Sequence, residues 1–212
     1  MKNVIRNTVN GILAGILIAI GGSVFLASYG DGSLVSRTIG AVFFSVALLC
    51  ICYKGYSLFT GKVGYIPEKH DGNAFSVLLW GLLGNAIATI LIGLALREAM
   101  PSLGVPAELI CTAKLAQEWW QTLVRAIFCG MLMYLAVSIY RDKNTTSAIF
   151  FCVPVFILAG FEHSIANMFY FGAAGMVDLD SVRYLAIVIL GNSIGGMLLP
   201  SLSMIVTPPT KS

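Results

Sequence analysis

The sequence predicts an all-α membrane protein with six transmembrane helices arranged as an inverted repeat of three plus three. An apolar composition, six long apolar runs and a pair of motifs that recur at one spacing lead to this prediction. Of the 212 residues, 58% are hydrophobic and only 11% are charged, whereas a soluble domain carries about 25% charged residues. The chain is therefore expected to lie in lipid.

Each expected helix is a run of about 18 or more mostly apolar residues, which is long enough to cross about 30 Å of hydrocarbon. The runs are 9–26, 39–59, 75–96, 123–139, 148–171 and 185–206. No polar segment between them exceeds about 25 residues, which leaves no room for a soluble domain. Residues 1–212 are thus predicted to form a single transmembrane domain.

The first run has features of a secretory signal. It follows Lys2 and Arg6 and is followed by Ala27 and Ser28, so cleavage after it is an alternative to a first transmembrane helix. The run is longer than the apolar region of a typical signal and pairs naturally with the later runs, which favours a retained helix.

Basic residues beside the runs indicate how the chain is oriented. Seven fall on the side that the termini share with the second and fourth loops, and five fall on the other side. The seven are Lys2, Arg6, Lys62, Lys69, Arg141, Lys143 and Lys211, and the five are Arg37, Arg97, Lys114, Arg125 and Arg183. Since basic residues concentrate on the cytoplasmic side, both termini are expected in the cytoplasm and the protein in the plasma membrane.

Four of the five cysteines fall within the expected helices and only Cys111 falls in a loop. Disulfides and a metal cluster are therefore not expected. The sequence also predicts no cofactor and no nucleic-acid partner.

Two landmarks recur at one offset. A shift of 107 positions lays Ser57 on Ser164, and the same shift lays the Leu-Gly-Asn motif ending at Asn85 on the one ending at Asn192. This agreement indicates a duplication, with repeat 1 at about 1–100 and repeat 2 at about 115–212. Because each half holds three helices, the second half is expected to enter the membrane from the opposite face, with the substrate path between the halves.

Glycines and polar residues interrupt the second and fifth runs near the matched serines, at 54–62 and 160–167. Irregular backbone is tolerated at membrane depth only where protein or a wet cavity satisfies its polar groups, so both helices are predicted to be broken. Ser57 and Ser164 are each expected to cap a half-helix whose positive end favours anions. The alternative is that these serines and glycines mark close helix packing.

Residues 160–168, with the sequence GFEHSIANM, resemble the fifth-helix signature of the formate/nitrite transporter family. The sequence LFTG at 58–61 is similar to the family's motif in the broken second helix, and the two Gly-Asn pairs fit its third and sixth helices. Lys114, eleven residues before Arg125, is similar to the family's lysine entering the fourth helix. The resemblance implies an aquaporin-like protomer with its own pore, assembled into a homopentamer that passes formate, nitrite or hydrosulfide.

The chain departs from the family's pattern in several places. Ser57 stands where the family usually has an acidic residue, and Gly130 stands where it has an asparagine. The second half of the second helix is shortened, and Lys54 is an additional cation. These departures leave the identity of the anion open.

His163 is the only histidine in an expected helix, and it is expected to control permeation. An ionisable group inside a membrane is costly unless it faces a cavity or finds partners, so His163 is expected to line the pore. Imidazole donates to anions and exchanges protons near neutral pH, and the resemblance assigns this role to the family's central histidine. The alternative is a histidine bonded only to backbone.

Three polar neighbours accompany His163. Thr60 and Asn167 occupy matching positions in the two repeats and are expected to flank His163, with local capping as the alternative for both. Adjacent residues on a helix point about 100° apart. Glu162 is therefore expected to face away from the pore, where it holds the loop or pairs with a cation.

Large apolar residues must keep bulk water out of such a pore. Phe44 and Leu48 share a helix face, and with Phe156 they match the constriction positions that the resemblance implies; core packing is the alternative. Lys114 is expected to attract anions at the vestibule rim, with a snorkelling lysine as the alternative.

Two other functions fit parts of the pattern. Ser164 beside His163 suggests an intramembrane protease, but no Gly-x-Ser-x-Gly elbow surrounds the serine and His70 falls in a loop. An aquaporin-like channel for a small neutral solute shares the predicted fold but lacks Asn-Pro-Ala motifs. The sequence therefore favours a proton-linked conduit for a small monovalent anion over an enzyme.

Overall fold

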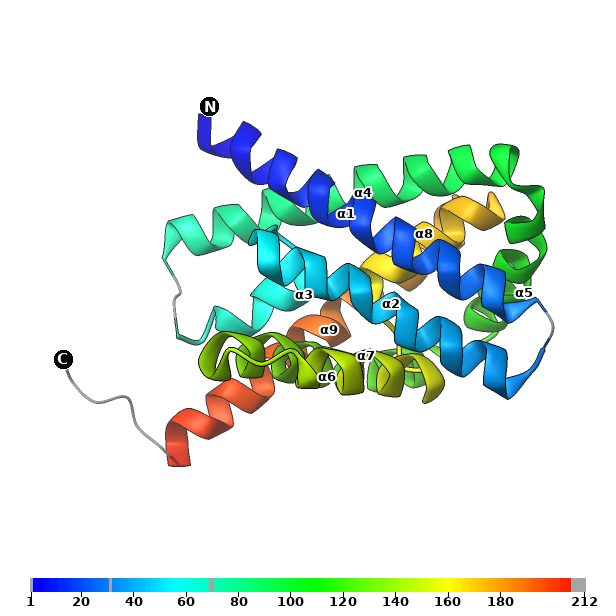
Figure 1. The fold of residues 1–212 in the computed structure, drawn as a ribbon. Helices are drawn as coiled ribbons and strands as arrows, with labels where there is room; N and C mark the ends of the chain where they lie inside the picture. Colours follow the sequence, from blue (N-terminus) through cyan, green and yellow to red (C-terminus); the bar gives the residue numbers. More distant parts are fainter. Residues whose placement is uncertain (1, 31, 69–70, 207–212) are drawn as a thin grey trace.

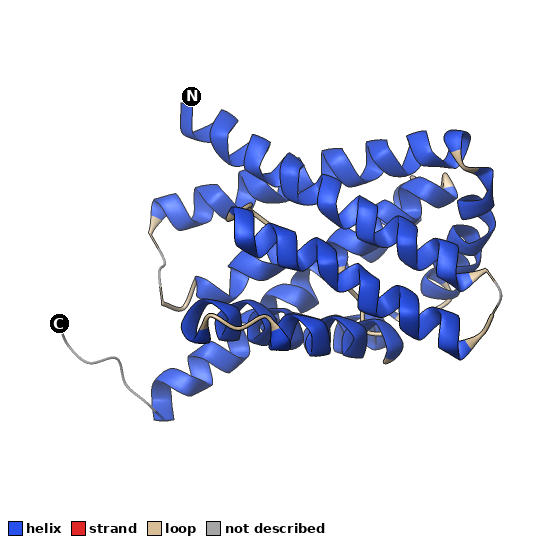
Figure 2. Ribbon diagram, viewed as in Figure 1, coloured by secondary structure: helices blue, strands red, loops and turns tan. Residues whose placement is uncertain are grey.

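The structure, a computed structural model, describes residues 2–30, 32–68 and 71–206. Within these ranges it consists of helices and the turns that join them, without a strand (Figure 2). Lys69, His70 and Lys211, which entered the sequence interpretation, lie outside the described residues.

The helices pack side by side in one bundle (Figure 1). In chain order they are α1 Lys2–Tyr29, α2 Leu34–Lys54, α3 Phe59–Lys62, the 3-10 turn η1 Val63–Tyr65, α4 Gly72–Ala99, the 3-10 turn η2 Pro101–Leu103, α5 Gly104–Leu115, α6 Trp119–Lys143, α7 Ser147–Leu158, α8 Ser164–Ala174 and α9 Leu179–Val206.

Five of the described helices, α1, α2, α4, α6 and α9, are long and apolar enough to cross a membrane. The sequence predicts a sixth such run at 148–171. The structure instead has two shorter helices there, α7 and α8, with residues 159–163 between them. In the same way, residues 55–58 separate α2 from the single turn of α3.

Local capping explains where several helices begin and end. The Ser33 side chain accepts a hydrogen bond from the N–H of Val35 at the start of α2. The helix ends at Lys54 and is capped by Gly55, whose φ of 69° is left-handed. The Asp71 carboxylate accepts a 2.7 Å bond from the N–H of Ala74 at the start of α4. These caps satisfy backbone groups that have no partner within the helix.

Two helix pairs, α1 with α4 and α6 with α9, approach each other through glycines. A Cβ on Gly84 would lie 2.2 Å from the backbone oxygen of Thr8, and one on Gly195 would lie 1.8 Å from that of Ile127. Small residues at such contacts let helix backbones meet in membranes. At Gly130, where the family pattern has an asparagine, a Cβ would lie 2.3 Å from the backbone oxygen of Asn192, so α6 and α9 leave no room for a side chain.

The remaining contacts join these two pairs. Helix α2 packs on α1, α7 packs on α6, and α2 and α7 contact each other. In Figure 1, α1 and α4 run from left to right, whereas α9 runs back to the left, so the start of α1 and the end of α9 lie at the same end of the bundle.

The segment between α4 and α6 is more ordered than the sequence predicts. It contains η2 and α5, and α5 packs against α8. Cys111, expected in a loop, lies in α5 and is fully buried. Lys114 lies in the last turn of the same helix.

Replacing Gly195 by alanine is expected to destabilise the bundle, because the new methyl group would overlap the backbone of α6 and force α6 and α9 apart. Overpacking of this kind costs about 1–3 kcal/mol or more. Thermal unfolding in detergent should show a lower midpoint for Gly195→Ala. The matched control is Gly104→Ala, because no atom lies within 4 Å of the added Cβ; equal midpoints for the two variants would contradict the close packing.

Candidate functional site

Two cavities enter the bundle at opposite ends of α2. The first cavity, of about 300 Å³, includes Arg37 near the start of α2 and Lys114 at the end of α5, and it reaches His163. The second cavity, of about 400 Å³, includes residues at the end of α2 and of α6, and it reaches Leu58.

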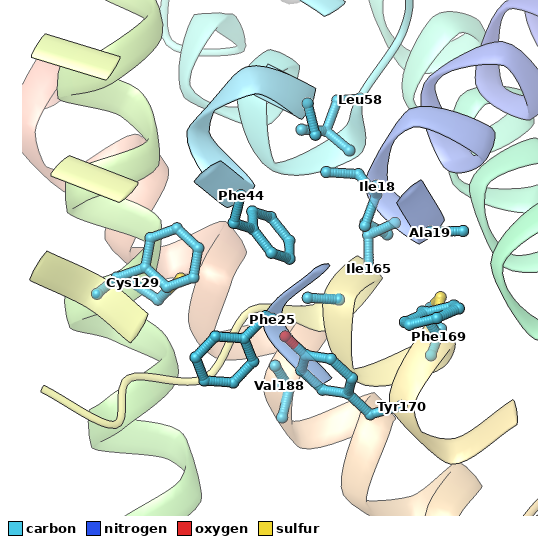
Figure 3. Close-up of a cluster of buried hydrophobic side chains, with 14 of the residues drawn as sticks. Ile18, Ala19, Phe25, Phe44, Leu58, Cys129, Ile165, Phe169, Tyr170 and Val188 are labelled. Carbon is cyan, nitrogen blue, oxygen red and sulfur yellow. The ribbon is translucent and has the colours of Figure 1, made fainter. Parts of the chain in front are cut away.

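An apolar layer lies between the two cavities. Phe156 lines the first cavity and Leu48 lines the second. Phe44 lines neither and is 2% exposed; its ring meets that of Phe156 edge-on, with centroids 6.4 Å apart. Figure 3 shows Phe44 between Leu58 on one side and Phe25 on the other. The three residues expected at constrictions thus lie at or between the inner ends of the cavities.

His163 stands at the inner end of the first cavity and is 2% exposed. It is the N-cap residue of α8, where its Nδ1 accepts a 3.0 Å hydrogen bond from the N–H of Ala166. Its Nε2 lies 2.8 Å from Oγ1 of Thr60, and its ring stacks on Phe156 with centroids 5.4 Å apart.

This bonding pattern assigns the tautomer of the neutral ring. Because Nδ1 of His163 accepts, the ring hydrogen lies on Nε2, which donates to the Thr60 hydroxyl. Thr60 is fully buried, and its own hydroxyl hydrogen has no further partner among the described residues. The pair therefore has a hydrogen to offer to a molecule in the apolar layer.

Asn85 of α4 holds the break between α2 and α3. Its Oδ1 accepts a 2.9 Å hydrogen bond from the N–H of Phe59, the first residue of α3. Its Nδ2 donates to the backbone oxygens of Gly11, at 2.8 Å, and Ser57, at 3.0 Å. One side-chain amide therefore satisfies three buried backbone groups.

Asn192 of α9 does the same at the break between α7 and α8. Its Oδ1 accepts a 2.9 Å hydrogen bond from the N–H of Ser164, the first residue of α8. Its Nδ2 donates to the backbone oxygens of Ala126 and Glu162, both at 2.8 Å. Both asparagines are fully buried.

These bonds correct the repeat register at the breaks. The two asparagine Oδ1 atoms accept from the N–H groups of Phe59 and Ser164, so these two residues are equivalent. The Nδ2 atoms donate to the backbone oxygens of Ser57 and Glu162, which are equivalent for the same reason. Both pairs are 105 residues apart. The sequence matched Ser57 with Ser164 at an offset of 107. The predicted equivalence of Thr60 with Asn167 is displaced by the same two residues.

The corrected register identifies Leu58 as the counterpart of His163, because each is the N-cap residue of its half-helix. The predicted capping by Ser57 and Ser164 is wrong. Helix α3 begins at Phe59, two residues after Ser57, and α8 already includes Ser164. Neither serine lines a cavity, and the buried hydroxyl of Ser164 has no hydrogen-bond partner among the described residues.

Glu162 is 1% exposed and is surrounded by donors. Lys114 Nζ forms an ion pair with its Oε2, Gln117 Nε2 donates to Oε1 at 2.9 Å, and Asn167 Nδ2 donates to Oε2 at 2.9 Å. A buried carboxylate requires such compensation. Lys114 is thus not the free rim cation that the sequence predicts, and the Asn167 amide is directed at Glu162 rather than at His163.

Sequence reasoning left several residues out of the candidate site. Asn85 and Asn192 were visible as a repeated motif, but their role depends on backbone contacts that a motif does not reveal. Leu58 would have emerged had the repeats been aligned on the starts of the half-helices. Arg37 and Arg125, which line the first cavity, entered the sequence argument only through orientation and spacing.

Comparisons with known proteins agree on one family. The family model for the formate/nitrite transporter matches residues 2–206. A "Probable formate transporter" of Methanothermobacter thermautotrophicus is 30% identical, over 87% of this chain and 82% of its own length. An "Uncharacterized transporter YwcJ" of Bacillus subtilis is 28% identical, over 92% of this chain and 86% of its own length.

A solved structure described as a "Pentameric formate channel with formate bound" is also similar to this chain. It is 25% identical, with a TM-score of 0.78, and the match covers 97% of each chain.

Replacing Asn192 by alanine is expected to destabilise the protein, because it leaves the N–H of Ser164 and the backbone oxygen of Glu162 unpaired at the break. Each unsatisfied buried group costs about 1–3 kcal/mol. The thermal unfolding midpoint in detergent should fall well below that of Ser193→Ala. This neighbouring change removes only the local bond from the Ser193 hydroxyl to the Ile189 oxygen; equal midpoints would show that the asparagine does not hold the break.

Proposed function

The chain belongs to the formate/nitrite transporter family, and we propose that it is a channel for a small monovalent anion of a weak acid, namely formate, nitrite or hydrosulfide, with passage linked to a proton through His163. The family consists of transporters and channels rather than enzymes.

The observation that carries the proposal is the position of His163 between the first cavity and the apolar layer. An anion that enters this layer loses its hydration, which is costly unless polar groups or a proton compensate. The hydroxyl hydrogen of Thr60, which the bond from His163 Nε2 leaves free, provides a donor at that point.

The proton linkage follows from the second ring nitrogen. Nδ1 of His163 accepts the hydrogen bond from the N–H of Ala166 that caps α8. When the ring is charged, Nδ1 carries a proton and can no longer accept this bond. The loss of a helix cap costs about 1 kcal/mol. In the proposal, the ring becomes charged only while an anion beside it compensates for that loss. The ring takes its added proton from water in the first cavity, gives a proton to the anion and returns to the neutral form, and the anion crosses the apolar layer as its neutral acid.

The proposed channel has six spans, of which the second and fifth are each built from two half-helices. The region of α7 and α8 supports this assignment, because residues 147–174 number 28, the same as α9. Helices α4 and α9 carry the matched asparagines and run in opposite directions (Figure 1), which supports two inverted repeats, at about 1–100 and 115–212.

Large apolar side chains on the outside of the bundle support a membrane and subunit environment; Phe151 is 72% exposed and Val105 is 65% exposed. We propose that this surface faces lipid and neighbouring copies in a homopentamer. The similarity to a structure described as a pentameric formate channel supports that number. We further propose a plasma membrane location with both termini in the cytoplasm.

A substrate panel tests the proposed function. In proteoliposomes, formate, nitrite and hydrosulfide are each expected to equilibrate faster than in empty vesicles, because all three are small anions of weak acids. Stopped-flow measurements of internal pH or vesicle volume follow that flux. Lactate and glycerol complete the panel; transport of glycerol without any of the anions would establish an aquaporin-like neutral channel instead.

Substitution of His163 by alanine tests the proton linkage. Formate flux is expected to fall by about tenfold or more, because a buried hydrogen bond to a charged group is worth about 1.5–3 kcal/mol. The remaining flux should lose its dependence on pH between about 5 and 8.

The control for this substitution is Ser193→Ala, measured in parallel with oligomer size and unfolding midpoint. Unchanged formate flux and pH dependence in a folded His163→Ala protein would refute the role of His163.

A further inference from the structure

The first cavity is lined by three basic residues and one acidic residue, namely Arg37, Lys114, Arg125 and Glu162. Lys114 and Glu162 form an ion pair with each other. Two opposite charges in contact produce little field at a distance, so Lys114 contributes little to attracting anions. The unbalanced positive charge of the lining lies on the two arginines.

Within the described part of the chain, no acidic side chain balances the charge of Arg37. It lies near the start of α2, and the Tyr29 ring holds its guanidinium with 5.7 Å between Cζ and the ring centroid. No carboxylate of the described residues forms an ion pair with it. Its Nε is buried and has no hydrogen-bond partner among them. A buried unpaired donor is unfavourable, and Arg37 lines the first cavity, where a bound anion would supply an acceptor.

Arg125, on α6, also lines the first cavity. Its backbone oxygen accepts a 3.4 Å hydrogen bond from the N–H of Glu162, and its Nη1 lies 4.0 Å from the place a Cβ of Gly160 would occupy. Its guanidinium is therefore close to the break before α8. In the described part of the chain, no carboxylate forms an ion pair with it.

The second cavity has a different charge balance. Arg141 pairs with Glu68 at 3.5 Å and with Asp142 at 2.6 Å, and its guanidinium lies over the Tyr65 ring at 4.3 Å. Lys62 is the remaining cation of the lining. The positive charge that is free to attract an anion is therefore larger at the first cavity.

We infer that Arg37, assisted by Arg125, captures the anion in the first cavity before it reaches His163, and that Lys114 serves to neutralise Glu162. A guanidinium presents two parallel N–H donors that match two oxygens of one anion. Arg37 therefore recognises two-oxygen anions such as formate and nitrite better than hydrosulfide. This inference rests on the proposed function and assigns the capture step to a residue other than the lysine.

The test is the concentration dependence of flux in proteoliposomes containing the full chain or its Arg37→Gln variant. At low ionic strength the half-saturating formate and nitrite concentrations should rise by about three- to tenfold, while the maximal flux stays the same. The difference should shrink in 0.5 M of an impermeant salt, because about 0.5 M salt screens charges beyond a few ångströms. The half-saturating concentration of hydrosulfide should rise less than that of formate.

The matched control is Arg183→Gln, which removes the same charge from an exposed position in neither cavity lining. If the half-saturating formate and nitrite concentrations of Arg37→Gln equal those of Arg183→Gln, the inference is overturned while the proposed function stays intact. A hydrosulfide shift as large as that of formate would overturn the recognition of two oxygens. Absence of anion flux in the unmodified protein would remove the proposed function, and the inference with it.

Discussion

The arrangement of the whole bundle depends on two buried asparagine side chains. A helix can be interrupted at membrane depth only if other groups satisfy the freed N–H and C=O groups. Asn85 and Asn192 do this from the neighbouring long helices α4 and α9, because an amide side chain both accepts and donates. Each also bonds a backbone oxygen of the helix packed beside its own, Gly11 in α1 or Ala126 in α6. Each asparagine therefore links a break to one of the two helix pairs that pack closely through glycines.

The two breaks differ in the side chains that they carry at equivalent positions. The N-cap position of α8 carries His163, whose ring both caps the helix and contacts Thr60. The equivalent N-cap position of α3 carries Leu58, which provides no side-chain cap. Similarly, Glu162 with its buried ion pair corresponds to Ser57 in the first half. The polar groups are therefore concentrated in the second half, while the first half contributes an apolar wall, with Thr60 as its polar contact to His163.

Local patterns predicted much of this fold. The apolar runs correspond to α1, α2, α4, α6 and α9, and the repeated Leu-Gly-Asn motif contains the two asparagines at the breaks. The register at the breaks escaped prediction because it is set by hydrogen bonds between residues 26 or 28 positions apart. The serines matched at 107 by coincidence. The prediction of Lys114 as a free cation at the vestibule rim failed for a similar reason, since its partner Glu162 is 48 residues away in the sequence. Helix α5, which positions Lys114, lies in a stretch that was expected to be a loop.

An experimental structure of the protein in lipid nanodiscs with formate tests the central claim most directly. The account predicts interrupted chains at residues 55–58 and 159–163, with the side-chain amides of Asn85 and Asn192 against them, and density for the anion on the path past His163 and Thr60. Continuous helices through both segments, with the imidazole packed away from any cavity, would contradict it.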